Sequence, residues 1–204
     1  MNISKTLLRR TLVIITFAGV ALSLVFVFLF FLRSPTQNVP IALAANTSAL
    51  YEQEKVNSGL PVHLEIPKIN VDAALESVGL TPQGAVGVPE GPVNAAWFDL
   101  GPRPGENGSA VIVGHFGWKN GIPAVFDNLY KLQKGDKIYV EDETGTITTF
   151  VVREVRTYDQ NEDASSVFNS SDGKAHLNLI TCQGVWNKAQ KSYSDRLVVF
   201  ADKE

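Results

Sequence analysis

Hydrophobic and polar residues follow two different patterns along this chain, and the change falls near residue 60. Thr11 to Leu32 form an uninterrupted apolar run of 22 residues without a charge. At about 1.5 Å per residue, a helix of that length spans roughly 33 Å, which is enough to cross a bilayer core of about 30 Å. The run therefore predicts a single transmembrane helix at residues 11–32.

A cleavable signal peptide is the alternative interpretation of this run. Its apolar stretch would span about 7–15 residues and end at a small-residue site, and "ALAA" at residues 42–45 resembles such a site. The run is longer and more uniformly bulky, which favours an uncleaved anchor. Three basic residues precede it within residues 1–10 and Arg33 alone follows closely, so the positive-inside rule predicts a cytoplasmic N-terminus and an extracellular remainder.

Residues 33–59 are polar and small, which predicts a stalk or linker. Residues 60–204 instead contain short β-like runs separated by glycine and proline. Helical signal is confined to residues 122–132, with a turn at 165–171, so this domain is predicted to be mainly all-β, with a closed or nearly closed barrel. The predicted strands are VHLEIP (62–67), AVIVGH (110–115), KIYVED (137–142), TITTFVVREVRTY (146–158), HLNLITC (176–182) and RLVVFA (196–201).

Charge and cysteine content exclude several function classes. Residues 34–204 carry 14 basic and 21 acidic residues, a net charge of −7, which disfavours nucleic acid as a partner. The chain has a single cysteine, Cys182, so the exported domain cannot form an internal disulfide. The sequence has no Cys/His set with zinc spacing and no glycine-rich phosphate loop.

Cys182 lies at the end of an apolar strand, where a reactive thiol can meet a partner. On position alone, a buried inert thiol is equally consistent with the pattern. His115 ends the apolar strand 110–115 in the same way, and groups at the ends of neighbouring buried strands can face each other across a groove. His176 begins the strand that ends at Cys182, roughly 20 Å away, and is therefore out of reach.

Arg196 follows Cys182 by 14 residues and opens the last predicted strand. The intervening residues 183–195 have the length of a long loop between adjacent antiparallel strands, which would return the guanidinium to the thiol. A fixed cation there could stabilise a thiolate or an oxyanion. A surface ion pair with Asp195 is the alternative role for this arginine.

These segments, in this order and spacing, resemble the sortase family. The resemblance covers residues 60–203, and its proline- and glycine-rich approach to the histidine is most similar to class F or the related D and E groups. The residues that carry it are VIVGH (111–115), LITC (179–182) and RLVVFA (196–201), with the further similar segments IPKINVDAALESVGL, GPRPGENGSAVIVGH and VFDNLYKLQKGDKIYV.

The resemblance implies an eight-stranded sortase-type β-barrel with one or two short helices, and the activity of a cysteine transpeptidase without a cofactor. Such enzymes cleave an LPxTG-like C-terminal sorting signal through a thioester and transfer the protein to an amine of cell-wall peptidoglycan or its lipid-linked precursor. Carried over, Cys182 is the nucleophile, His115 the general acid and base, and Arg196 the group that orients the substrate and stabilises the oxyanion. The partners are then secreted proteins with a sorting signal, met at the outer face of the cell membrane.

Three further residues are predicted to contact the substrate. Thr181 matches the family threonine that helps to hold the substrate carbonyl, and a simple β-forming role explains it equally well. Trp186 and Tyr193 either line a groove for the sorting peptide or pin the loop by packing. The acidic residues 141–143 could hold calcium, which requires several oxygen ligands, but a solvated turn is favoured and no metal site is expected.

Two other functions are compatible with parts of the sequence. A non-enzymatic, membrane-anchored β-domain could bind wall components or a partner protein, with Cys182 incidental. A papain-like hydrolase is disfavoured because its cysteine precedes the histidine and lies on a helix. Here His115 comes 67 residues before Cys182, and the cysteine follows a strand pattern.

Overall fold

The computed structural model describes residues 58–159, 162–189 and 192–204. The chain divides into two units, Met1–Glu54 and Lys55–Glu204, and every described residue belongs to the second. The predicted cytoplasmic N-terminus (1–10), transmembrane helix (11–32) and most of the stalk (33–59) lie outside the described residues and stay predictions. Within the described residues, no helix is both long and apolar enough to span a membrane.

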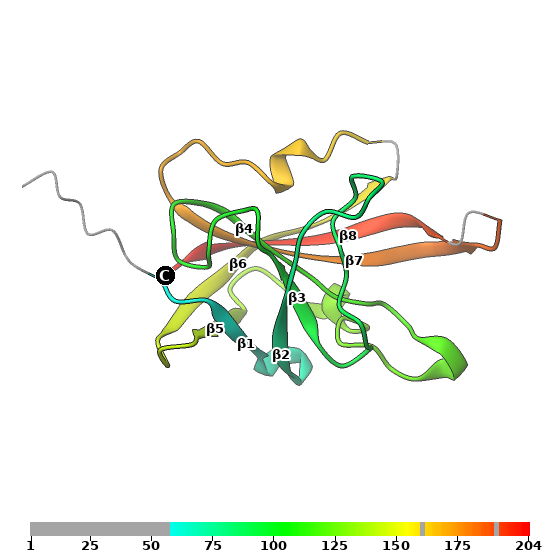
Figure 1. Ribbon diagram of the computed structural model, residues 1–204, viewed down its shortest axis with the longest axis horizontal. Coiled ribbons are helices and arrows are strands. Elements are labelled where there is room, and N and C mark those ends of the chain that lie inside the picture. Colours follow the sequence, from blue (N-terminus) through cyan, green and yellow to red (C-terminus); the bar gives the residue numbers. More distant parts are fainter. Residues whose placement is uncertain (1–57, 160–161, 190–191) are drawn as a thin grey trace, which may run out of the picture. The chain divides into compact units, whose positions relative to one another are not determined.

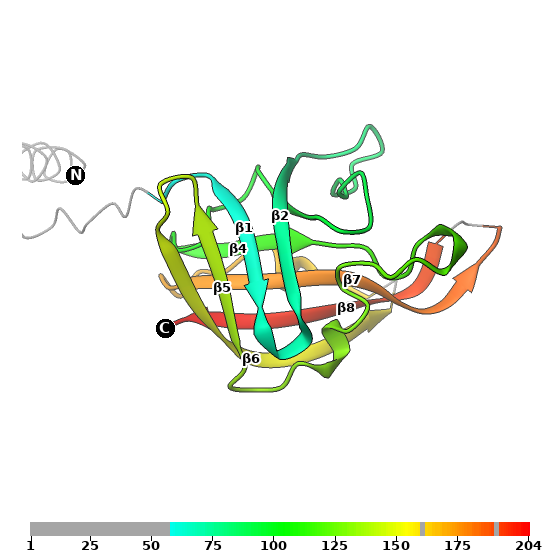
Figure 2. The ribbon, with the colours of Figure 1, turned by 90° about the horizontal axis from the view of Figure 1, so that it is seen from below.

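Eight strands close into a barrel in the described part of the chain (Figures 1 and 2). Their order around the barrel is β1-β2-β3-β4-β7-β8-β6-β5, and β5 pairs back with β1. The predicted mainly all-β, eight-stranded barrel is confirmed. In chain order the strands are β1 (Pro61–Ile66), β2 (Val71–Val78), β3 (Ala95–Phe98), β4 (Gly108–Val113), β5 (Lys137–Asp142), β6 (Ile147–Asp159), β7 (Ala175–Asn187) and β8 (Ser192–Lys203).

The parallel pairing of β4 with β7 brings two strand ends to the same edge of the barrel. Its register sets Val113, the last residue of β4, beside Ile180 of β7. β8 then pairs antiparallel with β7 along its length. In both views the β7–β8 hairpin extends beyond the barrel at this edge (Figures 1 and 2).

The predicted long loop at residues 183–195 is wrong, because β7 continues to Asn187 and β8 begins at Ser192. The pairing survives an irregularity between Gln183 and Trp186, where Gly184 adopts a φ of 88°. That left-handed conformation suits glycine, and a bulge of this kind bends a strand without ending it. The polar composition of residues 183–195 is typical of a loop, but their backbone pairs as the two strands of a hairpin.

Alternation along the strands separates the barrel interior from an outer layer. On β7, Leu177 and Leu179 face the barrel core, whereas Ile180 packs into the outer clusters. The outer face of β7 and β8 is covered by the connection between β6 and β7, here called the wall segment (residues 162–174), drawn in yellow to orange in Figure 1. The outer cluster beneath it is built from Tyr158, Val167, Val198 and Phe200.

Helical structure among the described residues is limited to short 3-10 turns. They are η1 (Pro67–Ile69), η2 (Lys119–Gly121), η3 (Leu129–Lys131) and η4 (Ser165–Val167). The predicted helix at 122–132 is therefore wrong apart from η3, while the predicted turn at 165–171 contains η4. The backbone amides of Val125 and Phe126 donate to Pro92 and His115, so tertiary hydrogen bonds replace the i to i−4 bonds of an α-helix.

Candidate active site

His115 follows β4 directly, and Gly114 sets how its backbone packs. A Cβ at Gly114 would lie 2.7 Å from a methyl carbon of Val125 and closer still to the ring of the fully buried Phe126. The chain after β4 can therefore approach Val125 and Phe126 this closely only because Gly114 has no side chain. The carbonyl of His115 accepts the Phe126 amide at 3.1 Å. Together these contacts fix the backbone at the histidine.

The imidazole of His115 is oriented from a different connection, the one between β2 and β3. Its Nε2 lies 2.9 Å from the carbonyl oxygen of Pro89. Because a carbonyl only accepts, Nε2 carries the proton, and the lone pair of the neutral ring is then on Nδ1. The ring also packs against Trp118, with centroids 4.7 Å apart. The sequence pattern gave no sign of these two partners, because both lie in irregular connections without a periodic signal.

Cys182 lies on β7 beside the end of β4. The Gly114 amide donates to the carbonyl of Ile180 at 3.1 Å, and the Thr181 hydroxyl donates to the carbonyl of Gly114 at 2.8 Å. The pairing of β4 with β7 thus continues one residue beyond β4. His115 and Cys182 are the next residues along two adjacent parallel strands, which is the arrangement expected from the two apolar runs.

Arg196 is the direct cross-strand partner of Cys182 in the antiparallel β7–β8 pair. Its guanidinium donates to the carbonyls of Tyr193 and Asp195, at 3.0 and 2.9 Å, and to the Ser192 hydroxyl at 3.1 Å. The ion pairs formed among the described residues do not include Arg196. The alternative pairing with the Asp195 carboxylate is not seen there, so the positive charge stays available beside the thiol.

Burial raises the pKa of the Cys182 thiol, and the charge of Arg196 lowers it by a smaller amount. The thiol is therefore mainly protonated at neutral pH. A nucleophile in that state needs a base to accept its proton as it attacks. His115 at the neighbouring strand end, with Nδ1 as its lone-pair nitrogen, supplies a base of suitable chemistry.

Three cavities in the described part of the chain are lined by Cys182, and Arg196 lines two of them as well. The largest, about 650 Å³, is lined by His115, Cys182 and Arg196 together with four aromatic side chains, and we call it the aromatic groove. The second, about 360 Å³, shares Cys182 and Arg196 and is lined mainly by apolar side chains, and we call it the apolar groove. The aromatic side chains are Phe116, Trp118, Trp186 and Tyr193, and the apolar side chains include Val86, Val88, Val113, Val167, Phe168, Ile180 and Val198.

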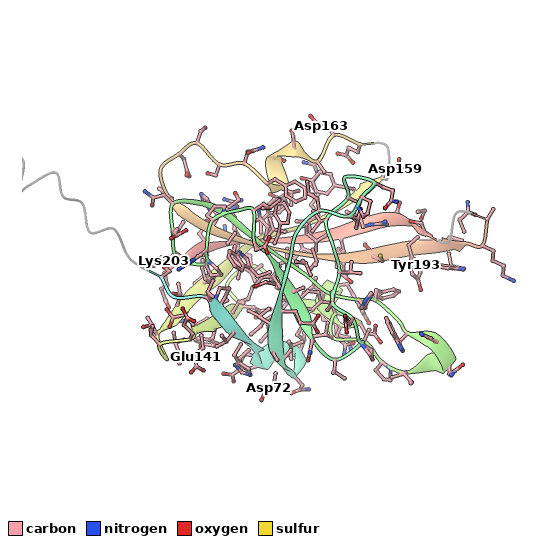
Figure 3. The ribbon with its side chains drawn as sticks, viewed as in Figure 1. Asp72, Glu141, Asp159, Asp163, Tyr193 and Lys203 are labelled. Atoms are coloured by element: carbon pink, nitrogen blue, oxygen red, sulfur yellow. The ribbon has the colours of Figure 1, made fainter. Side chains whose placement is uncertain are left out.

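The three predicted substrate contacts lie in different settings. Thr181 is buried, with its hydroxyl already donated to Gly114, so it ties β7 to β4. Trp186 and Tyr193 line the aromatic groove and pack against each other, with centroids 5.1 Å apart. Tyr193, labelled in Figure 3, lies near the start of β8, at the opposite end of that strand from Lys203, and its ring also meets Phe116 at 5.5 Å. Both rings therefore pack and line a groove at once.

The acidic turn at residues 141–143 is organised by hydrogen bonds to protein groups. The Asp142 carboxylate accepts the amides of Gly59, Thr144 and Thr146 and the hydroxyl of Thr144. These bonds, led by the one from the Thr144 hydroxyl, lower the pKa of Asp142 to about 2. Across the described ranges, the His, Cys, Asp and Glu side chains form no group that could hold a metal ion.

Comparison with known proteins assigns the family. The family model for the sortase domain matches residues 64–204, more than half of the chain, while no curated protein sequence matches it. Solved structures at low identity support the fold. They include a lid mutant of sortase A from Corynebacterium diphtheriae (21% identity, 74% of each chain covered, TM-score 0.55), sortase C-1 from Actinomyces oris (23%, 78% of this chain and 81% of that one, 0.54) and a sortase D5 transpeptidase from Clostridium perfringens (24%, 79% and 88%, 0.53). With the barrel and the site described above, this chain belongs to the sortase family.

Proposed function

We propose that this protein is a cysteine transpeptidase that cleaves an LPxTG-like C-terminal sorting signal through a thioester and transfers the protein to an amine of the cell wall. Membership of the sortase family supports the reaction class. The observation that carries the proposal is that the imidazole, the thiol and the guanidinium all line the aromatic groove. Their order and residue types match the roles that the family pattern assigns to His115, Cys182 and Arg196.

In the first half of the proposed reaction, the Cys182 sulfur attacks the carbonyl carbon of the sorting-signal threonine while its proton passes to His115. The Arg196 guanidinium stabilises the negative charge on the tetrahedral oxygen. The carbon–nitrogen bond then breaks, and His115 returns the proton to the departing amine. The products are a thioester on Cys182 and the released C-terminal peptide.

In the second half, a neutral wall amine attacks the thioester carbon and gives a proton to His115. The carbon–sulfur bond breaks, the sulfur regains the proton and the new amide is released. Because one histidine serves both amines, the departing and the incoming amine occupy the same place. His115 lines the aromatic groove and is not part of the apolar groove, so both amines use the aromatic groove. The acyl part of the sorting signal is assigned to the apolar groove because Arg196 lines it beside Cys182, whereas the third cavity at Cys182 does not include Arg196.

Features of the sequence on both sides of the described boundary complete this proposal. A transmembrane anchor at residues 11–32 would hold the catalytic domain at the outer face of the cell membrane, where exported proteins and the lipid-linked wall precursor meet. The proline- and glycine-rich approach to His115 supports a place in class F or the related D and E groups. Secreted proteins that carry a sorting signal and the wall amine are the proposed partners.

A peptide-library assay tests the function. The full-length protein is incubated with LPxTG-like peptides, with and without an amine acceptor, and products are identified by mass spectrometry. We expect cleavage after the threonine, a transfer product only when the amine is present, and neither product with Cys182→Ala. Full turnover by Cys182→Ala would contradict the proposal, and cleavage that never yields the transfer product would make the protein a hydrolase. Absence of cleavage, with a peptide or wall component bound instead, would favour the non-enzymatic β-domain.

A further inference from the structure

The outer face of β7 carries an alternating row of residues that ends at the thiol. Leu177 and Leu179 point into the barrel core, so His176, Asn178, Ile180 and Cys182 share the outer face by the two-residue period of a strand. Ile180 packs in the outer clusters and lines the apolar groove together with Cys182. The same strand therefore presents the proposed nucleophile at one end and two buried polar residues at the other.

The wall segment forms one side of the apolar groove. Val167 and Phe168 line that groove with Cys182 and Arg196, and Val167 is almost fully buried. The only regular structure in the described part of this segment is the three-residue turn η4. A connection with so little regular structure depends on contacts with the barrel for its position. The contacts between the wall segment and the barrel therefore determine the position of this side of the apolar groove.

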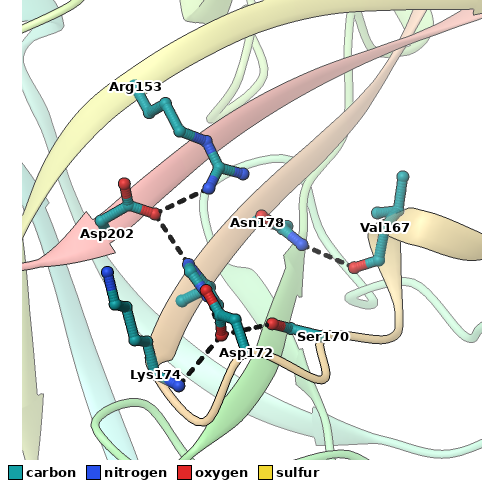
Figure 4. Close-up of polar contacts among 8 residues, drawn as sticks. Arg153, Val167, Ser170, Asp172, Lys174, Asn178 and Asp202 are labelled. Carbon is teal, nitrogen blue, oxygen red and sulfur yellow. Dashed lines mark hydrogen bonds and ion pairs between the residues drawn. The ribbon is translucent and has the colours of Figure 1, made fainter.

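A polar latch holds the C-terminal end of the wall segment, where Asp172, Asp202 and Arg153 come together (Figure 4). His176 lies between two carboxylates, with Nδ1 2.7 Å from Asp202 and Nε2 3.0 Å from Asp172. Asp172 belongs to the wall segment and also accepts the Lys174 amide and the Ser170 hydroxyl. Arg153 donates to Asp202 at 2.9 Å from the other side. The latch therefore connects β6, β7 and β8 to the wall segment.

The chemistry of the latch makes its contacts strong. Ionised carboxylates only accept, so both contacts of His176 are hydrogen bonds when both ring nitrogens carry protons. The bond from His176 is the largest of the interactions that hold the pKa of Asp172 well below its usual range. The imidazole is nearly fully buried, with 5% of the residue exposed, whereas the side chains of Asp172 and Asp202 are 49% and 44% exposed.

Asn178 provides a second hold directly beneath the groove wall. Its Nδ2 donates to the carbonyl of Val167 at 2.6 Å, and the residue is 1% exposed. The bond fixes the backbone of a residue whose side chain lines the apolar groove. At the opposite end of the wall segment, Arg156 of β6 forms an ion pair with Glu162. The segment is thus anchored at both ends and in the middle.

We infer that His176, Asp172 and Asn178 are positioning residues for the sorting signal, because they hold Val167 and Phe168 over the outer face of β7 and so shape the apolar groove beside Cys182. This inference rests on the proposed function for its kinetic consequence. None of the three residues lines either groove. Their effect is therefore on peptide binding through the wall segment and leaves the thiol chemistry itself unchanged.

The test compares Asp172→Ala with wild type in the full-length protein, and with Asp99→Ala as a matched control. Asp99 is an exposed aspartate whose side chain makes no hydrogen bond or ion pair in the described structure. Asp172→Ala is expected to raise KM for the sorting peptide about tenfold with kcat within about twofold, which corresponds to about 1.4 kcal/mol of binding. Asp172→Asn keeps an acceptor oxygen for His176, so it is expected to recover part of the loss.

Two further measurements separate this inference from the proposed function. Hydrogen exchange of the amides at 164–168 is expected to speed up in Asp172→Ala and not in Asp99→Ala, while the reaction of Cys182 with a small methanethiosulfonate stays at the wild-type rate. Unchanged exchange and KM in Asp172→Ala would overturn the inference, as would an equal fall in kcat and in the thiol reaction rate. Faster exchange in a protein that turns over no peptide would support the latch and overturn the proposed function.

Discussion

The two ends of the outer face of β7 both carry polar side chains, but they differ in how far those side chains are paired with charged partners. At the His176 end every ring nitrogen has a carboxylate partner, and the residue is buried. At the Cys182 end the thiol is only partly buried, it has no hydrogen-bond partner among the described residues, and the arginine beside it has no ion-pair partner there. Side chains that are paired with charged partners fix the position of the segments they join. A thiol and a guanidinium without such partners can instead interact with a substrate.

The largest effect is expected from Cys182→Ala, which removes the nucleophile from the Cys182 end of the outer face of β7. Peptide turnover should be abolished, because no other thiol exists in the chain. The side chain makes no structural hydrogen bond, so the thermal unfolding temperature should stay within about 2 °C of wild type. Peptide kinetics and calorimetry of the same preparation measure both. A Cys182→Ala variant that unfolds, or one that stays active, would contradict the proposed difference between the two ends of β7.

The next largest effect is expected from Arg196→Gln. The guanidinium is proposed to stabilise the tetrahedral oxyanion, and loss of one such donor reduces kcat about 100- to 1,000-fold. Arg196→Lys is the informative companion, since a lysine keeps the charge without the planar fork that reaches two carbonyls and a hydroxyl. Steady-state kinetics should rank wild type above lysine and lysine above glutamine. Equal activity in all three would remove Arg196 from the mechanism.

His176→Ala should give the reverse profile, a change in stability and peptide binding without loss of the chemical step. The substitution leaves Asp172 and Asp202 without their shared donor, and the unfolding temperature is expected to fall by about 5 °C. kcat at saturating peptide should stay within about twofold. Should kcat collapse while the unfolding temperature stays constant, His176 would belong to the catalytic end of the strand.

The smallest expected effect is a shift in the pH dependence of thiol modification. Burial raises the pKa of Cys182 above that of an ordinary thiol, and the charge of Arg196 opposes that rise. The reaction with an uncharged thiol reagent should therefore keep accelerating beyond pH 9, because the thiolate fraction is still increasing there. Arg196→Gln removes the opposing charge and should move the profile to still higher pH. A profile that levels off below pH 8 would mean a stabilised thiolate and a different resting state.

Much of the barrel and of the site was predictable because it depends on local pattern. The apolar runs that end at His115 and Cys182 are strands buried on both sides, and their parallel pairing sets both residues at one edge. Arg196 opens a third run, and its place beside Cys182 was expected from a return of the chain between adjacent antiparallel strands. Each run is visible in consecutive residues, whereas the pairing of β4 with β7 joins residues far apart in the chain.

Most of the errors and omissions have one cause, which is hydrogen bonding between residues far apart in the chain. The helix expected at 122–132 is replaced by bonds from Val125 and Phe126 to distant carbonyls. The loop expected at 183–195 is a different case, because it is a hairpin whose pairs are local and whose polar composition concealed the strands. The latch joins His176 to a carboxylate 26 residues away, and Pro89 orients His115 across 26 residues. Sequence periodicity carries no information about such pairings.

Mass spectrometry of the acylated enzyme tests the central claim most directly. The full-length protein is mixed with an LPxTG-like peptide in the absence of an amine, quenched in acid, digested and searched for modified peptides. The account predicts the N-terminal part of the peptide attached as a thioester to Cys182, and its disappearance with formation of an amide when an amine is added. A thiol that reacts with methanethiosulfonate yet never carries the acyl group, while peptide cleavage proceeds, would contradict the account.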